Sequence, residues 1–163
     1  MSTPVNPEEE TAWRRRLGSG ANNRGWALSE KHSRTPEEDQ EMLNAAHASM
    51  HLWSTIGNDR NFALGHLLLG QVHALLGNPS YAMQYATSAH GHFTTKDGAP
   101  WEVAMAHAVL ANAAHCSGNT ALHESSYRTA DELVAKLPYP EERQILLATM
   151  RVVPRPAGGE NAT

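Results

Sequence analysis

The sequence predicts an all-α protein, built from about six to eight helices that pair as antiparallel hairpins. No segment of the 163 residues alternates apolar and polar side chains or concentrates β-branched residues, which would indicate strands. Capping residues, prolines and glycines instead recur at the ends of helix-length segments. The connections between these segments have about two to five residues, so consecutive helices are expected to lie antiparallel.

Residues 1–35 are expected to form an N-terminal helical arm, with helices near 7–17 and 20–32. Asn6 precedes Pro7 and three glutamates, which is the usual order of an N-cap, a first-turn proline and acids at the positive end of a helix. Glycine lowers the stability of a helix by about 1 kcal/mol relative to alanine. We therefore expect the helix to break where three glycines fall close together: Gly18, Gly20 and Gly25.

Residues 36–152 are expected to form the main helical domain, and residues 153–163, which are polar and rich in proline and glycine, a disordered tail. Thr35 and Glu38 have the spacing of a capping box at the start of this domain. Further helix starts are expected at Asn58, Asn78 and Asn119. Left-handed helix ends are expected at Gly57, Gly77 and Gly118. The expected helices run near 36–56, 59–76, 79–95, 99–117, 120–136 and 140–151.

Charged residues are concentrated toward the two ends of the chain. The 81 residues from Leu43 to His123 carry five of the 30 Asp, Glu, Lys and Arg side chains, and residues 61–95 carry none. Nine of the ten histidines lie in this middle segment. Because exposing such a segment favours association, we expect both the charged ends of the chain and a partner chain, most simply a second copy, to cover it.

The composition excludes several classes of function. The net charge of −4 offers no basic face for a nucleic acid. A single cysteine, Cys116, excludes an internal disulfide framework and a cysteine-built zinc site, and fits a reducing compartment. The first residues lack the features of a secretory signal, and no apolar run is long enough to span a bilayer. We therefore expect a cytoplasmic protein that binds neither nucleic acid nor membrane.

A helix-turn-helix pattern occurs twice in the chain, with a spacing of 41 residues. In the first copy Leu69-Gly70 precedes Gly77-Asn78, and in the second Leu110-Ala111 precedes Gly118-Asn119. Small residues after each turn let the second helix pack closely on the first. These small residues are Ala82, Ala86 and Ala89 in the first copy and Ala130 in the second.

This pattern, over residues 60–136, resembles the tetratricopeptide repeat, a helix-turn-helix unit with a usual period of 34 residues. The chain departs from that pattern in its longer period, in His73, where an aromatic residue is usual, and in His123, where a small residue is usual. It is similar to small bacterial proteins of this class. The resemblance implies either a right-handed superhelix of hairpins with a concave groove or a more compact bundle.

A repeat of this kind implies a scaffold that works by binding another protein or peptide, a copy of itself, or both. We expect a homodimer, no covalent chemistry and no cofactor. A small-molecule pocket is a third possibility. The polar residues expected to line a groove are His47, Trp53, Asn61, Gln71, His73, Tyr85 and Asn112.

The alternative is a small helical metal-dependent enzyme or metal-binding protein. Counted from the connecting turns at 1.5 Å per residue, four histidines lie at one height along neighbouring helices to within about 3 Å. Facing helices of bundles commonly carry metal sites, and imidazole suits zinc, copper or iron. Whether the side chains converge depends on the rotation of each helix, which the sequence leaves open. The four are His51, His66, His90 and His107.

Overall fold

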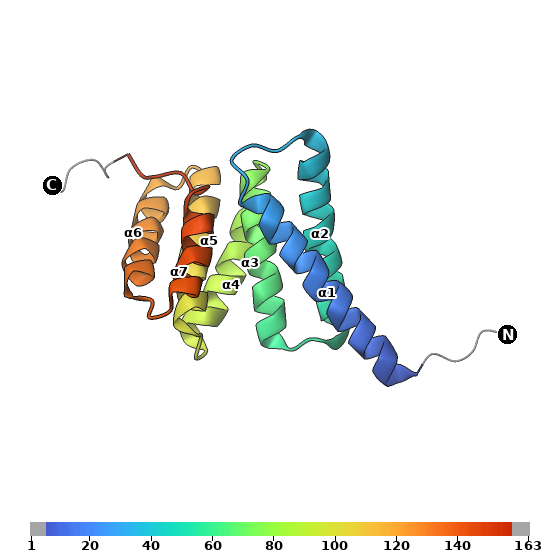
Figure 1. The fold of residues 1–163 in the computed structure, drawn as a ribbon. Helices are drawn as coiled ribbons and strands as arrows, with labels where there is room; N and C mark the ends of the chain where they lie inside the picture. The colour runs from blue at the N-terminus through green and yellow to red at the C-terminus, as the bar shows by residue number, and fades with distance from the viewer. Residues whose placement is uncertain (1–5, 158–163) are drawn as a thin grey trace.

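The computed structural model describes residues 6–157, and this part of the chain folds into seven packed helices without a strand (Figure 1). The predicted all-α class and the predicted number of helices are confirmed. The helices are α1 (Pro7–Ser29), α2 (Pro36–Ile56), α3 (Asp59–Leu75), α4 (Pro79–Thr95), α5 (Pro100–Cys116), α6 (Thr120–Lys136) and α7 (Pro140–Met150).

The helices pair in chain order, α1 with α2, α3 with α4 and α5 with α6. The pairs follow one another across the molecule, with α2 against α3 and α4 against α5 (Figure 1). The first helices of the pairs also contact one another, since α3 lies against both α1 and α5. Helix α7, which follows the last pair, packs on α5. The helices α1, α3, α5 and α7 therefore form a row in which each helix contacts the next.

The two central helices of this row belong to the segment that is poor in charged residues. Residues 67–74 of α3 and 108–114 of α5 are all buried. Helices α1 and α2 cover α3, and α6 and α7 cover α5. Of the charged ends, α1 packs on α3 and α7 packs on α5, whereas most of α2 and all of α4 belong to the charge-poor segment itself. What stays exposed of the charge-free stretch lies on α4, at residues such as Tyr81, Gln84 and Thr87, and in the turn before it.

The two repeat copies end their first helices in the same way. Gly77 and Gly118 have φ values of +73° and +75°, which confirms both predicted left-handed ends. After Gly77, the Asn78 N–H donates to the carbonyl of His73, and after Gly118 the Asn119 N–H donates to the carbonyl of Ala114, both at 2.9 Å. This is the hydrogen bond of a Schellman motif, and it turns the chain directly into the next helix.

Other helix ends agree with the sequence only in part. Asn58 and Asn119 cap α3 and α6 through their side-chain oxygens, as predicted, whereas Asn78 makes no such cap hydrogen bond. The predicted left-handed end at Gly57 is wrong, because its backbone is extended, with φ −87° and ψ −179°. Glycine is needed there for another reason: a Cβ atom would lie 2.6 Å from the carbonyl oxygen of Trp53.

Helix α1 is continuous, so the predicted break at its glycines is wrong. Two of these glycines lie where α1 approaches its neighbours. A Cβ atom on Gly18 would lie 3.4 Å from the ring of Trp53, and one on Gly25 would lie 2.9 Å from Cδ2 of Leu68. Packing against α2 and α3 offsets the low helix propensity of glycine, as tertiary contacts often do.

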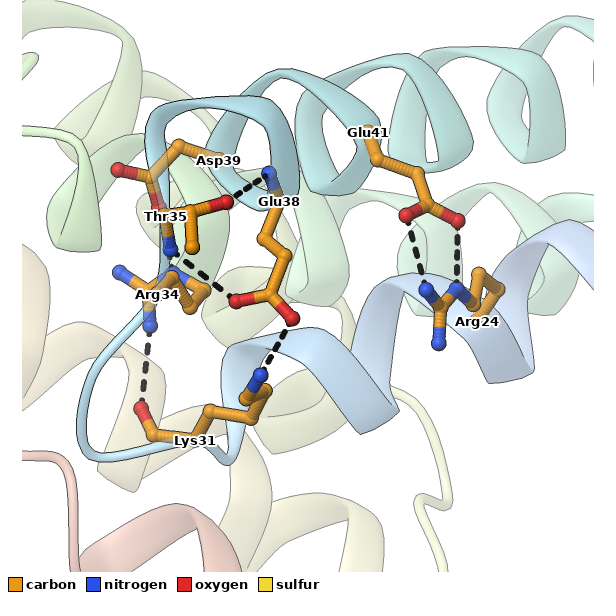
Figure 2. A network of polar contacts seen from close by, with 7 residues as sticks. All are labelled: Arg24, Lys31, Arg34, Thr35, Glu38, Asp39 and Glu41. Atoms are coloured by element: carbon orange, nitrogen blue, oxygen red, sulfur yellow. Dashed lines mark hydrogen bonds and ion pairs between the residues drawn. The ribbon is translucent and has the colours of Figure 1, made fainter.

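A capping box and ion pairs hold the turn between α1 and α2 (Figure 2). The Glu38 N–H donates to Thr35 Oγ1 at 3.2 Å, and the Thr35 N–H donates to the Glu38 carboxylate at 3.1 Å, which confirms the predicted capping box. Lys31 pairs with the same carboxylate. Arg24 donates to both oxygens of Glu41, at 2.6 and 2.8 Å. The region expected as an N-terminal arm is thus held to α2 of its own chain.

The start of the expected disordered tail packs on α6. Val153 is 2% exposed, and Nε2 of His123 donates to the carbonyl oxygen of Pro154 at 2.7 Å. The prediction of disorder is therefore wrong for these two residues, because the buried His123 fixes the chain after α7. Residues 158–163 of that tail lie outside the described part of the chain.

Candidate functional site

A cavity of about 490 Å³ opens along the row formed by α1, α3, α5 and α7. All four helices contribute lining residues, and α2 adds Trp53. Leu67 of α3 and Met105 of α5 are 1% and 3% exposed and form its floor. Ile145 of α7 is 51% exposed and lies at the mouth. The cavity therefore has a buried apolar base and an open side.

Three of the four tryptophans of the chain line this cavity: Trp26, Trp53 and Trp101. They come from three different helices, α1, α2 and α5, and each is half-buried. Gly18 of α1 packs against the ring of Trp53 and holds it at the cavity wall. Large aromatic surfaces that are partly open to solvent are common at binding sites, because they bury much area at a small entropy cost.

One face of α1 supplies most of the polar lining. Ser19, Asn22, Asn23, Trp26 and Glu30 follow one another at spacings of one, three or four residues, which places them on one side of the helix. Asn61 adds an amide from the first turn of α3. Asn61 Oδ1 accepts the Asn58 N–H at 3.2 Å, and Nδ2 of Asn22 lies 3.5 Å from Oδ1 of Asn23, so the three amides offer their remaining donors and acceptors beside the indole rings.

Among the described residues, Glu30 is the only charged one that lines the cavity. It follows the last residue of α1, where the helix dipole is negative. Burial raises the pKa of the Glu30 carboxyl, and the charge of Arg151 opposes this effect in part. None of the five ion pairs among the described residues engages Glu30. The negative charge of the Glu30 carboxylate is therefore offset only in part by the distant Arg151.

The volume and lining of the cavity are typical of ligand-binding sites, which are mostly apolar with a few fixed polar groups. Among the described residues, its polar groups are amides, a hydroxyl, indole N–H groups and one carboxyl, and none of them belongs to a cysteine, histidine or lysine. This chemistry suits reversible binding of a ligand with an apolar body and hydrogen-bonding groups.

The structure places only two of the residues predicted to line a groove at this cavity. Trp53 and Asn61 lie at the cavity. Gln71 and Asn112 are buried in the core, where the Asn112 amide donates to Gln71 Oε1 at 3.0 Å. These two residues occupy equivalent positions of the two repeat copies, 41 residues apart, so their hydrogen bond ties α3 to α5. They are structural residues, and their side chains are closed to a ligand.

The other predicted groove residues form a cluster on α2, α3 and α4. The ring of His73 stacks on Tyr85 at a centroid distance of 5.7 Å and lies 5.8 Å from the ring of His47. Tyr81 packs on the same imidazole at 5.1 Å. The Asn78 amide donates to Nδ1 of His73 at 3.3 Å, in place of capping α4. His73 is thus packed among the rings of His47, Tyr81 and Tyr85.

The four histidines predicted to share one layer do not meet at one point. His51 is exposed, and His66 contacts Tyr85 and Ser88. Only His90 and His107 are neighbours, with ring centroids 4.5 Å apart at an angle of 84°. Among residues 6–157, no group of three or more His, Cys, Asp and Glu side chains is arranged to hold a metal ion.

The His90–His107 pair has an unusual hydrogen-bonding state. Nε2 of His90 and Nδ1 of His107 are buried and have no hydrogen-bond partner among the described residues. Burial lowers the pKa of both imidazoles, and for His107 burial together with the nearby His90 lowers the pKa to about 4. Both rings are therefore neutral at pH 7, which is the form that binds metals.

A third histidine has the contact of a nucleophile–base pair. Nδ1 of His66 and Oγ of Ser88 are 2.9 Å apart, and burial lowers the pKa of the imidazole. Catalytic serine–histidine pairs also need a group that orients the base and donors that stabilise an oxyanion. Residues 61–95, which include α4 and nearly all of α3, contain no Asp or Glu that could orient the imidazole of His66. This contact is a polar link between α3 and α4.

Sequence reasoning missed most of the cavity, namely Asn22, Asn23, Trp26, Glu30 and Trp101. A signal was present in α1, where polar and aromatic residues recur on one helical face. It was obscured by the glycines, which predicted a broken helix in the same place. Trp101 carries no comparable signal, because its place at the cavity depends on how α5 packs beside α3.

None of the helices that the structure describes is both long and apolar enough to cross a membrane. Set against protein-family models, curated proteins and solved structures, the chain finds no match in any of the three.

Proposed function

We propose that this protein is a scaffold of the tetratricopeptide-repeat type that binds an extended peptide segment of a partner protein in the cavity along α1, α3, α5 and α7. The observation that carries the proposal is the group of three half-buried indole rings from separate helices around one cavity. Aromatic residues in such positions commonly supply most of the binding free energy of an interface.

The shape of the lined face supports a peptide over a compact ligand. Ser19 and Glu30, at the two ends of the α1 lining, are 11 residues apart and therefore about 16 Å apart along the helix axis. An extended chain rises about 3.3 Å per residue, so about five peptide residues span this length. The side chains of Asn22, Asn23 and Asn61 can pair with the N–H and C=O groups of such a chain.

The test uses a random-peptide display library as the probe. Peptides selected on the purified protein are measured against wild type, Trp101→Ala and Trp13→Ala. Trp13 is the fourth tryptophan, 58% exposed on α1 and outside the cavity, so its variant is the matched control. We expect Trp101→Ala to weaken binding by more than about tenfold and Trp13→Ala to leave it unchanged.

A second variant separates loss of binding from loss of folding. Ala27 is an exposed residue of the cavity lining, so Ala27→Trp fills the cavity without removing a core side chain. It is expected to weaken binding as Trp101→Ala does, with an unchanged melting temperature. Selected peptides that bind all of these variants equally would contradict the proposal.

A metal-binding role is the second candidate, and the His90–His107 pair favours it. Two neutral, adjacent imidazoles with unpaired nitrogens can donate to zinc or copper, and because these nitrogens are buried, further ligands from solvent or a partner require a local opening between α4 and α5. Titration of Zn²⁺ or Cu²⁺ into protein without a histidine tag tests this role. One equivalent bound by wild type and by His51→Ala, and lost in His107→Ala, supports it. Equal binding by all three proteins contradicts it.

A further inference from the structure

The position of Glu30 within the cavity narrows the chemistry of the ligand. Trp26 and Glu30 are four residues apart at the end of α1, so the indole and the carboxylate project from neighbouring positions on the same face of the helix. A cation placed between them would contact the face of an aromatic ring and a carboxylate at once. Both contacts are favourable, and both gain strength where the site is partly shielded from water.

The electrostatic surroundings also favour a cation. Apart from Glu30, no charged side chain, and so no basic one, lines the cavity in the part of the chain that the structure describes. The last carbonyl groups of α1 add negative potential at this end, and α1 has no basic residue in its last turn to neutralise it. Arg151 acts on Glu30 from a distance without forming an ion pair with it.

We infer that the cavity selects a peptide with a basic residue, a lysine or an arginine, whose charged group lies between the Glu30 carboxylate and the Trp26 indole. Apolar residues of the same peptide would contact Trp53 and Trp101 farther along the cavity. This inference rests on the proposed peptide-binding function and specifies the partner as a segment that combines a positive charge with apolar side chains.

The burial of Glu30 supports the same conclusion. Burial raises the pKa of its carboxyl, which means that the charged form lacks sufficient solvation or pairing in the free protein. A lysine or arginine of the ligand would supply that pairing. The carboxylate then contributes both to affinity and to the choice between basic and neutral peptides.

The experiment compares peptide selection on wild type, Glu30→Gln and Glu132→Gln. Glu132 is exposed on α6 and is not a lining residue, so its variant has the same change of net charge away from the cavity. Libraries panned on wild type and on Glu132→Gln are expected to become enriched in peptides with lysine or arginine next to apolar residues. Libraries panned on Glu30→Gln are expected to lose this enrichment.

Affinities of one selected peptide complete the test. We expect Glu30→Gln to weaken its binding by about tenfold, and replacement of its basic residue by norleucine to have a similar effect. In Glu30→Gln the norleucine replacement should have little further effect, because the two changes remove the same contact.

The possible failures are distinguishable. Selected peptides that lack basic residues, and that bind Glu30→Gln as well as wild type while Trp101→Ala weakens them, would contradict this inference and leave the proposed function standing. Basic peptides whose binding is unaffected by Trp101→Ala and Ala27→Trp would contradict both.

Discussion

Four histidines of the central helices are kept neutral by burial. The pKa values of His66, His73, His90 and His107 all lie below the ordinary value of imidazole, and burial is the first cause in each case. His47 adds a repulsive effect on His73, and His90 adds one on His107. These side chains therefore act as polar, uncharged parts of the packing at neutral pH.

This arrangement predicts a loss of stability in mild acid. Imidazoles of the unfolded chain titrate near pH 6.5, whereas His107 of the folded chain titrates near pH 4. Below pH 6.5 the unfolded state binds more protons, so the free energy of unfolding falls as the pH falls towards 4. His107 alone should cost about 1 kcal/mol between pH 7.5 and 5.5, and the other three act in the same direction.

Urea unfolding at pH 7.5 and at pH 5.5 measures this loss. His107→Gln should reduce the difference between the two values by about 1 kcal/mol, because its amide does not titrate. His51→Gln, which removes an exposed imidazole, is the matched control and should keep the full difference. Equal free energies of unfolding at the two pH values in the wild type would contradict the assignment of neutral buried histidines.

At the residue scale, the sequence predicted how far along its helix each histidine lies better than it predicted the direction in which the side chain points. Counted from the connecting turns, four histidines were predicted to lie in one layer, and two of them, His90 and His107, are in contact. This count did not predict that His51 points to solvent or that His66 turns to Ser88. These outcomes depend on the rotation of each helix about its axis, which no counting of residues determines.

At the scale of the helices, small residues determine where two helices can approach each other closely. Gly70 of α3 lies where α4 and α5 meet it, and a Cβ atom there would lie 3.0 Å from the backbone nitrogen of Ala86 and 3.0 Å from Cγ1 of Val109. Ala86 and Val109 are themselves fully buried. Neither helix can move without opening the core.

Gly70→Ala is therefore expected to destabilise the protein. Overpacking costs about 1–3 kcal/mol, and the better helix propensity of alanine returns up to about 1 kcal/mol, so a net loss of about 1 kcal/mol is predicted. Gly91 in α4 is exposed, with nothing within 4 Å of an added Cβ atom, so Gly91→Ala should stabilise by about 0.5–1 kcal/mol. Thermal unfolding of both variants checks the two signs, and stabilisation by Gly70→Ala would contradict the packing described.

Helix boundaries were the most predictable feature at this scale, because caps are local. The capping box of Thr35 and Glu38 and the left-handed Gly77 and Gly118 could all be located from the sequence. The continuous helix α1 could not, because its glycines are compensated by Trp53 and Leu68, which are distant in the chain. A local sequence pattern predicts the wrong structure where tertiary contacts outweigh local helix propensity.

At the scale of the whole molecule, the cavity exists because α1 and α7 lie beside the central α3 and α5 and leave a space lined by all four. The sequence predicted Trp53 and Asn61 as binding residues. It could not predict that Trp26 and Trp101, which are 75 residues apart, would face the same space. The two rings share this cavity because of the way the hairpins stack, and the residue pattern within one helix does not determine that stacking.

The same stacking bears on the expected homodimer. That prediction rested on the need to cover a middle segment poor in charged residues, and the helices of the chain itself cover most of it. The remaining charge-free surface on α4 combines polar side chains with the exposed Tyr81, and it lies on a different helix from those that line the cavity. Dimerisation stays a prediction separate from peptide binding.

The central claim is that the tryptophan-lined cavity is the binding site of this protein, and the indole N–H signals in ¹H–¹⁵N NMR spectra test it most directly. The chain has four tryptophans, three at the cavity and Trp13 outside it. Titration with a selected peptide is expected to shift the signals of Trp26, Trp53 and Trp101 and to leave that of Trp13 in place. A peptide that binds and shifts the Trp13 signal alone, or none of the four, would contradict the account.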